Sequence, residues 1–140
     1  MDKILLPGFA LLAGMTYFHL AGQPTAIENA PKAVAQGSTL VYFGARDCPA
    51  CRSFSSGSGY REMEAFARSN RMKFVSYENA SLRDLGRDNV YSDFTPVWRA
   101  TKSRTGQNAV PSFALVTDGG IVAASVGEWQ SVARKAKQGS

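Results

Sequence analysis

The sequence predicts an α/β domain with a mixed sheet, and three observations support this prediction. The run TLVYFGA at 39–45 is uncharged and rich in β-branched and aromatic residues, which is typical of a buried central strand. The stretch 113–126 indicates a β-hairpin, because two apolar runs flank the turn Asp118-Gly119-Gly120. The expected order is helix, strand, helix, strand, helix, strand, strand, helix, as in an α/β domain.

The first half of this order follows from local signals. A short helix is expected between Pro31, which suits a first helical turn, and Gly37, which suits a helix end. After the cysteine-containing segment, the Ser/Gly-rich stretch 55–60 interrupts helical structure, and a helix resumes over 61–70. The run MKFVSY at 72–77 predicts the second strand.

The second half contains the segment that is hardest to interpret. We expect residues 78–108 to begin as a polar loop and then form a helix, with Thr95 as N-cap and Pro96 in the first turn. A last helix over 128–137 has apolar residues on one face and cations near its end, where the helix dipole favours them. The tryptophan in each helix is expected in the core.

Composition argues against a nucleic-acid-binding protein. The chain has 140 residues, 44% of them hydrophobic, and a formal net charge of +5. Its basic residues are scattered and do not alternate with aromatics, as a base-stacking surface would require. The sequence therefore predicts a soluble basic surface on one domain of ordinary size.

The N-terminal residues differ from the rest of the chain. An uncharged apolar run occupies 4–18 and is preceded by Lys3, which is the pattern of a signal segment. With the residues that follow, it approaches the roughly 20 needed to span a bilayer. We expect a signal-anchor or signal peptide at 1–22, a linker at 23–30 and the folded domain at 31–140.

The two cysteines, Cys48 and Cys51, are separated by two residues. A structural zinc site needs four ligands, and the single histidine, His19, lies in the predicted signal segment. No metal site is therefore expected. A purely structural disulfide would close so short a loop that it would stabilise the domain little.

The position of the pair favours redox chemistry. A strand that leads into a helix through C-x-x-C places Cys48 at the helix N-terminus, where free N–H groups stabilise a thiolate. Cys51 follows one helical turn later and can reach Cys48. The flanking arginines, Arg46 and Arg52, would add positive potential, whereas Asp47 opposes it.

The pattern resembles the thioredoxin superfamily over roughly residues 31–138. The matching pieces are LVYFGARDCPACRSF, KFVSYENA and AVPSFALVTDGGIVAASVG, followed by the last helix. The resemblance implies a thioredoxin fold, in which helices flank a mixed central sheet. In this chain an N-terminal hydrophobic helix would precede that fold.

The resemblance also implies roles for individual residues. Cys48 would be the nucleophile and Cys51 the resolving thiol, and Pro111 would be a cis-proline that faces them. The backbone of Val110 would pair with substrate. Pro49 and Ala50, between the cysteines, would contribute to substrate binding.

Two positions depart from the thioredoxin pattern. Thioredoxins carry a buried acid where this chain has Tyr42, and a tryptophan where it has Asp47. Without that acid, proton removal from Cys51 would need another base or water. The direction of the redox reaction stays open for the same reason.

We therefore expect a thiol–disulfide oxidoreductase that acts on protein thiols or disulfides and uses no cofactor. It would work in the bacterial periplasm, anchored in the inner membrane or released by leader cleavage, with a membrane redox partner. The alternative is a non-catalytic thioredoxin-fold binding or scaffold module of an envelope complex.

Overall fold

The computed structural model describes residues 24–138. The strands are β1 (Thr25–Ala26), β2 (Ser38–Ala45), β3 (Lys73–Ala80), β4 (Ser112–Thr117) and β5 (Gly120–Val126). The helices are α2 (Lys32–Ala35), α3 (Pro49–Ser56), α4 (Ser58–Ser69), α5 (Thr95–Thr105) and α6 (Trp129–Gln138), with the 3₁₀ turns η1 (Leu82–Asp84) and η2 (Ser92–Phe94). From Lys32 onward, this is the order of helices and strands that the sequence predicts.

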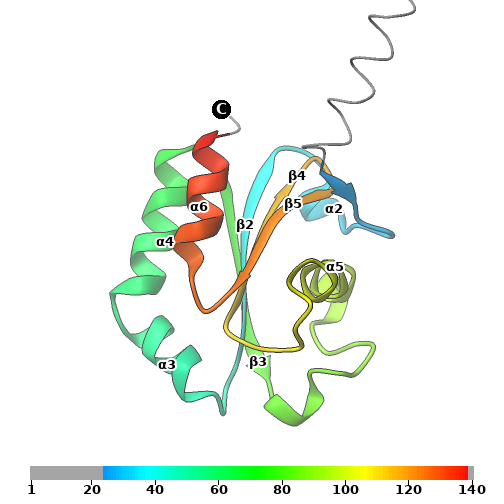
Figure 1. Cartoon of the computed structure of the whole chain (residues 1–140), viewed down its shortest axis with the longest axis vertical. Helices are drawn as coiled ribbons and strands as arrows, with labels where there is room; N and C mark the ends of the chain where they lie inside the picture. The colour runs from blue at the N-terminus through cyan, green and yellow to red at the C-terminus, as the bar shows by residue number, and fades with distance from the viewer. Residues whose placement is uncertain (1–23, 139–140) are drawn as a thin grey trace, which may run out of the picture.

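A mixed sheet forms the middle layer of the molecule (Figure 1). Its strand order is β1-β5-β4-β2-β3, in which β2 and β3 are parallel and the other pairs are antiparallel. Helices α3, α4 and α6 lie on one face, and α2 and α5 lie on the other. The chain therefore has the α/β fold with a mixed central sheet that the sequence predicts.

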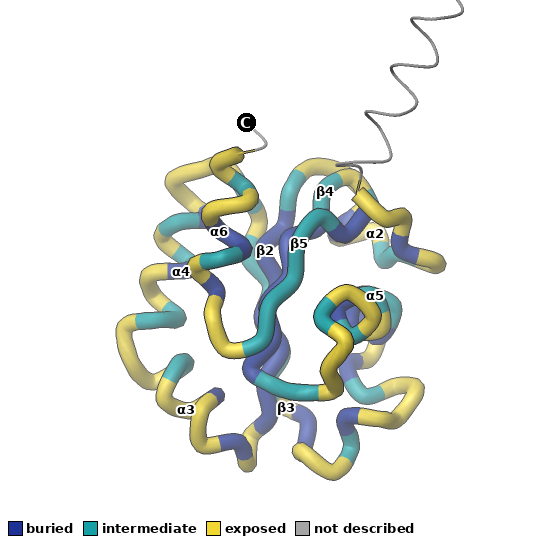
Figure 2. Tube along the Cα trace, in the orientation of Figure 1, coloured by how far each residue is buried: buried dark blue, intermediate teal, exposed yellow. Residues whose placement is uncertain are grey.

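The side chains of β2 alternate between the two faces of the sheet and contribute to both halves of the core. Leu40 and Tyr42 pack with residues of α4 and α6, whereas Val41 and Phe43 pack with residues of α2 and α5. Successive side chains of a strand point to opposite faces of the sheet, so one strand supplies both halves. The central strands are buried and the outer surfaces of the helices are exposed (Figure 2).

Several predicted element boundaries shift, and Thr95, expected as the N-cap, is instead the first residue of α5 after the N-cap Phe94. The strand predicted at 72–77 continues to Ala80, because Ala80 still pairs with Ala45 at the end of β2. The helix predicted at 61–70 begins at Ser58, and the break in the Ser/Gly-rich stretch narrows to Gly57. Both tryptophans lie in the core, with Trp98 fully buried and Trp129 9% exposed.

The segment 24–30 is joined to the sheet. Thr25 and Ala26 form β1 and pair with β5, and Ile27 is buried in the core. Part of the stretch expected to be a linker thus contributes a strand. The predicted signal segment at 1–22 lies outside the described residues, and none of the helices within 24–138 is long and apolar enough to cross a membrane.

Candidate functional site

The two cysteines form a disulfide in the first turn of α3. Cys48 is the N-cap residue of this helix and Cys51 is in its first turn, with their Cα atoms 5.2 Å apart. The backbone N–H of Cys51 donates a hydrogen bond to Sγ of Cys48 at 3.1 Å. The sulfur of Cys48 therefore occupies the place of a capping side chain, where helix N–H groups would stabilise a thiolate.

The two sulfur-bearing residues differ in exposure. Cys48 is 4% exposed, whereas Cys51 is completely buried. Pro49 and Ala50, the dipeptide between them, are both exposed. A substrate can thus approach from the Cys48 side of the pair and along Pro49 and Ala50, but not through Cys51.

The loop before β4 covers the disulfide from the other side. Its Val110-Pro111 peptide bond is cis, as the resemblance predicts. The carbonyl oxygen of Val110 lies 3.8 Å from Sγ of Cys48. Pro111 is buried and Val110 is half-buried against the cysteine pair. The structure thus brings together all six residues to which the resemblance assigns a role.

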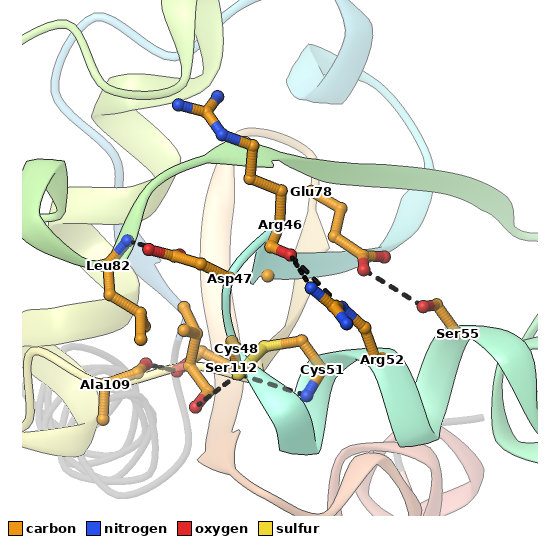
Figure 3. Close-up of a disulfide and its surroundings, with 12 residues drawn as sticks. Arg46, Asp47, Cys48, Cys51, Arg52, Ser55, Glu78, Leu82, Ala109 and Ser112 are labelled. Carbon is orange, nitrogen blue, oxygen red and sulfur yellow. Dashed lines mark hydrogen bonds between the residues drawn. A yellow bond between two sulfur atoms is a disulfide. The ribbon is translucent and has the colours of Figure 1, made fainter.

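Asp47 binds the segment that follows β3. Its carboxylate accepts a hydrogen bond from the backbone N–H of Leu82 at 2.9 Å and another from Oγ of Ser81 at 3.0 Å. The bond from Leu82 is the main reason that the pKa of Asp47 is lowered. Its negative charge is therefore directed to residues 81–82, as Figure 3 shows for Leu82.

The two arginines beside the cysteines bind backbone carbonyl groups. The guanidinium of Arg46 donates to the carbonyl oxygen of Asn79 at 2.8 Å, and that of Arg52 donates to the carbonyl oxygen of Arg46 (Figure 3). Both side-chain interactions lie at exposed positions. These arginines hold the loop before α3 in place, a role that the sequence did not indicate.

A polar cluster lies beneath the helix that carries the cysteines. The hydroxyl of Tyr42 donates to the carbonyl oxygen of Cys51 at 3.4 Å. Oγ of Ser55 donates to Oε1 of Glu78 at 3.1 Å. Burial raises the pKa of Tyr42, and the adjacent Glu78 carboxylate raises it further. The sequence did not indicate Ser55 or Glu78, because the two residues come together only through the packing of α3 beside β3.

The site has no arrangement suited to a metal. Across residues 24–138, no group of three or more His, Cys, Asp and Glu side chains could hold an ion. What the site can do chemically is exchange its own disulfide with an external thiol or disulfide.

No protein-family model and no curated protein matches this chain. Similar solved structures include Fasciola hepatica thioredoxin, at 18% identity and a TM-score of 0.46, with the match covering 76% of this chain and 84% of that one. Oxidised thioredoxin from Plasmodium falciparum is 15% identical, with a TM-score of 0.46, and the match covers 82% of this chain and 96% of that one. Malassezia sympodialis thioredoxin is 11% identical, with a TM-score of 0.49, and the match covers 82% of this chain and 92% of that one.

The chain has a thioredoxin-like α/β fold with a C-x-x-C disulfide. This fold contains the strand order β5-β4-β2-β3, the cysteine pair at the start of α3 and the cis-proline before β4.

Proposed function

We propose that this protein is a thiol–disulfide oxidoreductase that acts on protein thiols or disulfides through Cys48 and Cys51. One observation carries the proposal: the Cys48–Cys51 disulfide lies at the N-terminus of α3 with the Cys48 sulfur facing the Val110 carbonyl group. This position favours a thiolate at Cys48, and the Val110 backbone lies where an extended substrate segment could pair.

The reaction proceeds by two exchanges. In the reduced protein, the Cys48 thiolate attacks a substrate disulfide, forms a bond to one substrate sulfur and expels the other, which takes up a proton. The Cys51 sulfur then attacks Cys48, and the second substrate sulfur leaves as a thiol. Two electrons pass to the substrate while the Cys48–Cys51 bond forms. The reverse sequence oxidises a substrate dithiol.

We place this activity in the cell envelope. The apolar run at 4–18, preceded by Lys3, supports export with the N-terminal segment as an inner-membrane anchor or a cleaved leader. An oxidising compartment such as the bacterial periplasm permits the disulfide to persist. A protein anchored there would exchange electrons with a membrane redox partner.

Equilibration in glutathione buffers tests the proposal. The wild-type protein should show a reversible two-electron transition between roughly −270 and −120 mV, the span of known couples of this kind. Cys48→Ser should abolish insulin reduction and catalysed oxidative refolding, whereas Ser53→Ala, on the exposed side of α3, should leave both unchanged.

Trapping in cells identifies the substrates. Cys51→Ala should accumulate mixed disulfides between Cys48 and partner proteins, and additional loss of Cys48 should abolish them. Two results together would instead indicate the scaffold module. The cysteine pair would not cycle in glutathione buffers, and the protein would still capture one partner after both cysteines are replaced by serine.

A further inference from the structure

Pro24, the first described residue, lies at the end of the sheet that is opposite to the disulfide. It lies beside the turn between β4 and β5. Strand β2 starts at this end with Ser38, and Cys48 follows its other end. The eight residues of β2 separate the two ends by about 23 Å. Figure 1 shows the same separation between β1 and α3.

A cleft opens beside Pro24 at this end of the molecule. Its volume is about 400 Å³, and it lies between the end of α4, the last turns of α6 and strands β4 and β5. Part of its lining is apolar, so the cleft can accept more than a hydrated ion. The apolar side chains are those of Met72, Leu115, Val122 and Ala136.

Two exposed cations line this cleft. They are Arg71, which follows α4, and Lys135, near the end of α6. The described residues that line the cleft include no carboxylate, and within residues 24–138 neither cation forms an ion pair. The two charges are therefore available to an external anion.

The surroundings of the cleft add one cation and one acid. The ammonium group of Lys73 donates to the carbonyl oxygen of Gln36 at 3.0 Å. The carboxylate of Asp118, in the turn beside Pro24, accepts a hydrogen bond from the backbone N–H of Gly37 at 2.7 Å. Together with the two cations of the cleft, these groups leave an excess of positive charge, which attracts anions.

The backbone of Arg71 is in the left-handed region, with φ 57°. This conformation favours glycine or asparagine, and a residue with a longer side chain adopts it at a cost in stability. The side chain is exposed and forms no ion pair within the described residues, so local packing does not account for an arginine here. This supports a role for its charge in binding.

Under the membrane placement proposed above, chain length keeps this end of the domain near the bilayer. The apolar run at 4–18 is joined to Pro24 by residues 19–23. The six Cα–Cα steps from Phe18 to Pro24 span at most about 22 Å. The headgroup layer on each side of the hydrocarbon core is about 5–7 Å thick. Lipid headgroups are therefore within reach of the cleft beside Pro24.

We propose that the cleft between α4 and α6 binds the headgroups of anionic phospholipids, with Arg71 and Lys135 facing their phosphate groups. Cations next to apolar side chains suit the boundary between headgroups and acyl chains, where both kinds of group occur. The inference rests on the membrane placement proposed above and is independent of the redox chemistry. In this orientation the Cys48–Cys51 disulfide lies on the side of the domain that faces away from the lipid.

Lysine acylation of the full-length protein in lipid vesicles tests this orientation. The vesicles consist of phosphatidylcholine alone or of equal parts of phosphatidylcholine and phosphatidylglycerol. After treatment with a membrane-impermeant acylating reagent, mass spectrometry gives the rate at each lysine. Lys135 should react about fivefold more slowly in the anionic vesicles, the factor that corresponds to roughly 1 kcal/mol for one cation near an anionic surface. Lys102, on α5 outside the cleft, should react equally in both.

Salt and a single substitution identify the source of this protection. Sodium chloride at about 1 M shortens the Debye length to about 3 Å and should remove most of it. Arg71→Asn keeps a residue that tolerates the left-handed backbone, and it should lose most of the difference between the two lipid mixtures. Arg61→Gln is the matched control, because it removes an exposed cation of α4 that lies outside the cleft, and it should keep the difference.

Three outcomes would overturn the lipid-binding cleft. These are equal acylation of Lys135 in the two kinds of vesicle, equal protection of Lys102, and protection of Lys135 by inorganic phosphate without vesicles. The last result would indicate a site for a free anion. A protein that floats with neither kind of vesicle would contradict the membrane placement itself. Equilibration in glutathione buffers tests the redox function separately.

Discussion

Asp47 connects two segments that are distant in the chain. It directly precedes Cys48, and its carboxylate accepts hydrogen bonds from Ser81 and Leu82 after the end of β3. The neighbouring backbone N–H of Arg46 donates to the carbonyl oxygen of Ala80 at 2.9 Å. The loop that presents Cys48 is thereby fixed to the segment after β3.

Removing this carboxylate should destabilise the protein at neutral pH. Asp47→Ala leaves the Leu82 N–H and the Ser81 hydroxyl without their partner, so the urea midpoint at pH 7 should fall. The pKa of Asp47 is lowered in the folded protein, so its contribution is present above the unfolded pKa and is lost as pH falls through the folded pKa. The difference between variant and wild type should therefore shrink in acid.

Asp88→Ala is the matched control. The Asp88 side chain is 98% exposed and lies 3.8 Å from Arg99, an arrangement that contributes little to stability. Its urea midpoint should equal that of the wild type at pH 7 and in acid. Equal effects of the two substitutions would contradict the role assigned to Asp47.

Individual site residues were predictable when their spacing in the sequence carried the information. Cys48 and Cys51 belong to one helical turn, and Pro111 opens a recognisable hairpin, so local pattern and resemblance identified them. Glu78 reaches Tyr42 only through the register of β3 against β2, which no local pattern specifies. The partners of Asp47 depend equally on the tertiary arrangement.

At the scale of elements, Gly57 separates the two helices that follow β2. It is the C-cap of α3 and the N-cap of α4, with an extended backbone. A Cβ atom at this position would lie 2.7 Å from the backbone carbonyl oxygen of Ser53. The absence of a side chain at Gly57 thus permits the tight junction between α3 and α4.

Gly57→Ala should destabilise the protein although alanine is the better helix former. Relieving the contact with the Ser53 carbonyl group requires the backbone to shift, at a cost of about 1–3 kcal/mol. Thermal or urea unfolding measures this loss. Gly86→Ala is the control, because no atom lies within 4 Å of a Cβ built there, and it should be neutral or slightly stabilising.

Helices and strands could be predicted where neighbouring residues alone carried the pattern. The hairpin of β4 and β5 was predicted almost to the residue, because a Gly-Gly turn between apolar runs specifies it. The last residues of β3 were not, since Glu78 and Asn79 are polar and belong to the strand through pairing beside β2. Similarly, β1 has only two residues, which is too short for a recognisable strand pattern, and it is defined by its pairing with β5.

Two buried tyrosines make the stability of the whole molecule depend on pH in the alkaline range. Tyr42 and Tyr91 are 0% and 1% exposed, and burial raises the pKa of each. The Tyr91 hydroxyl also donates to the carbonyl oxygen of Gly44 at 2.8 Å. Both phenols are therefore kept neutral in the folded protein at pH values where an unfolded tyrosine ionises.

Stability should be insensitive to these groups below pH 10 and should fall above it. The unfolded state loses its tyrosine protons near pH 10, and the folded state does not until its higher pKa is reached. Each tyrosine should then remove about 1.4 kcal/mol per pH unit. Urea midpoints between pH 7 and pH 11 measure the decline.

Single substitutions separate the contributions. Tyr91→Phe should be less stable at pH 7, because the Gly44 carbonyl group loses its donor, but should show a shallower alkaline decline. An equally steep decline in Tyr91→Phe would contradict the assignment.

The disulfide closes a loop within a single turn of one helix. Opening such a bond frees little chain entropy, because the loop contains only the residues between Cys48 and Cys51. All strands of the five-stranded sheet lie outside this short loop. We therefore expect reduction of the bond to alter only the first turn of α3 and to leave the strand pairing unchanged.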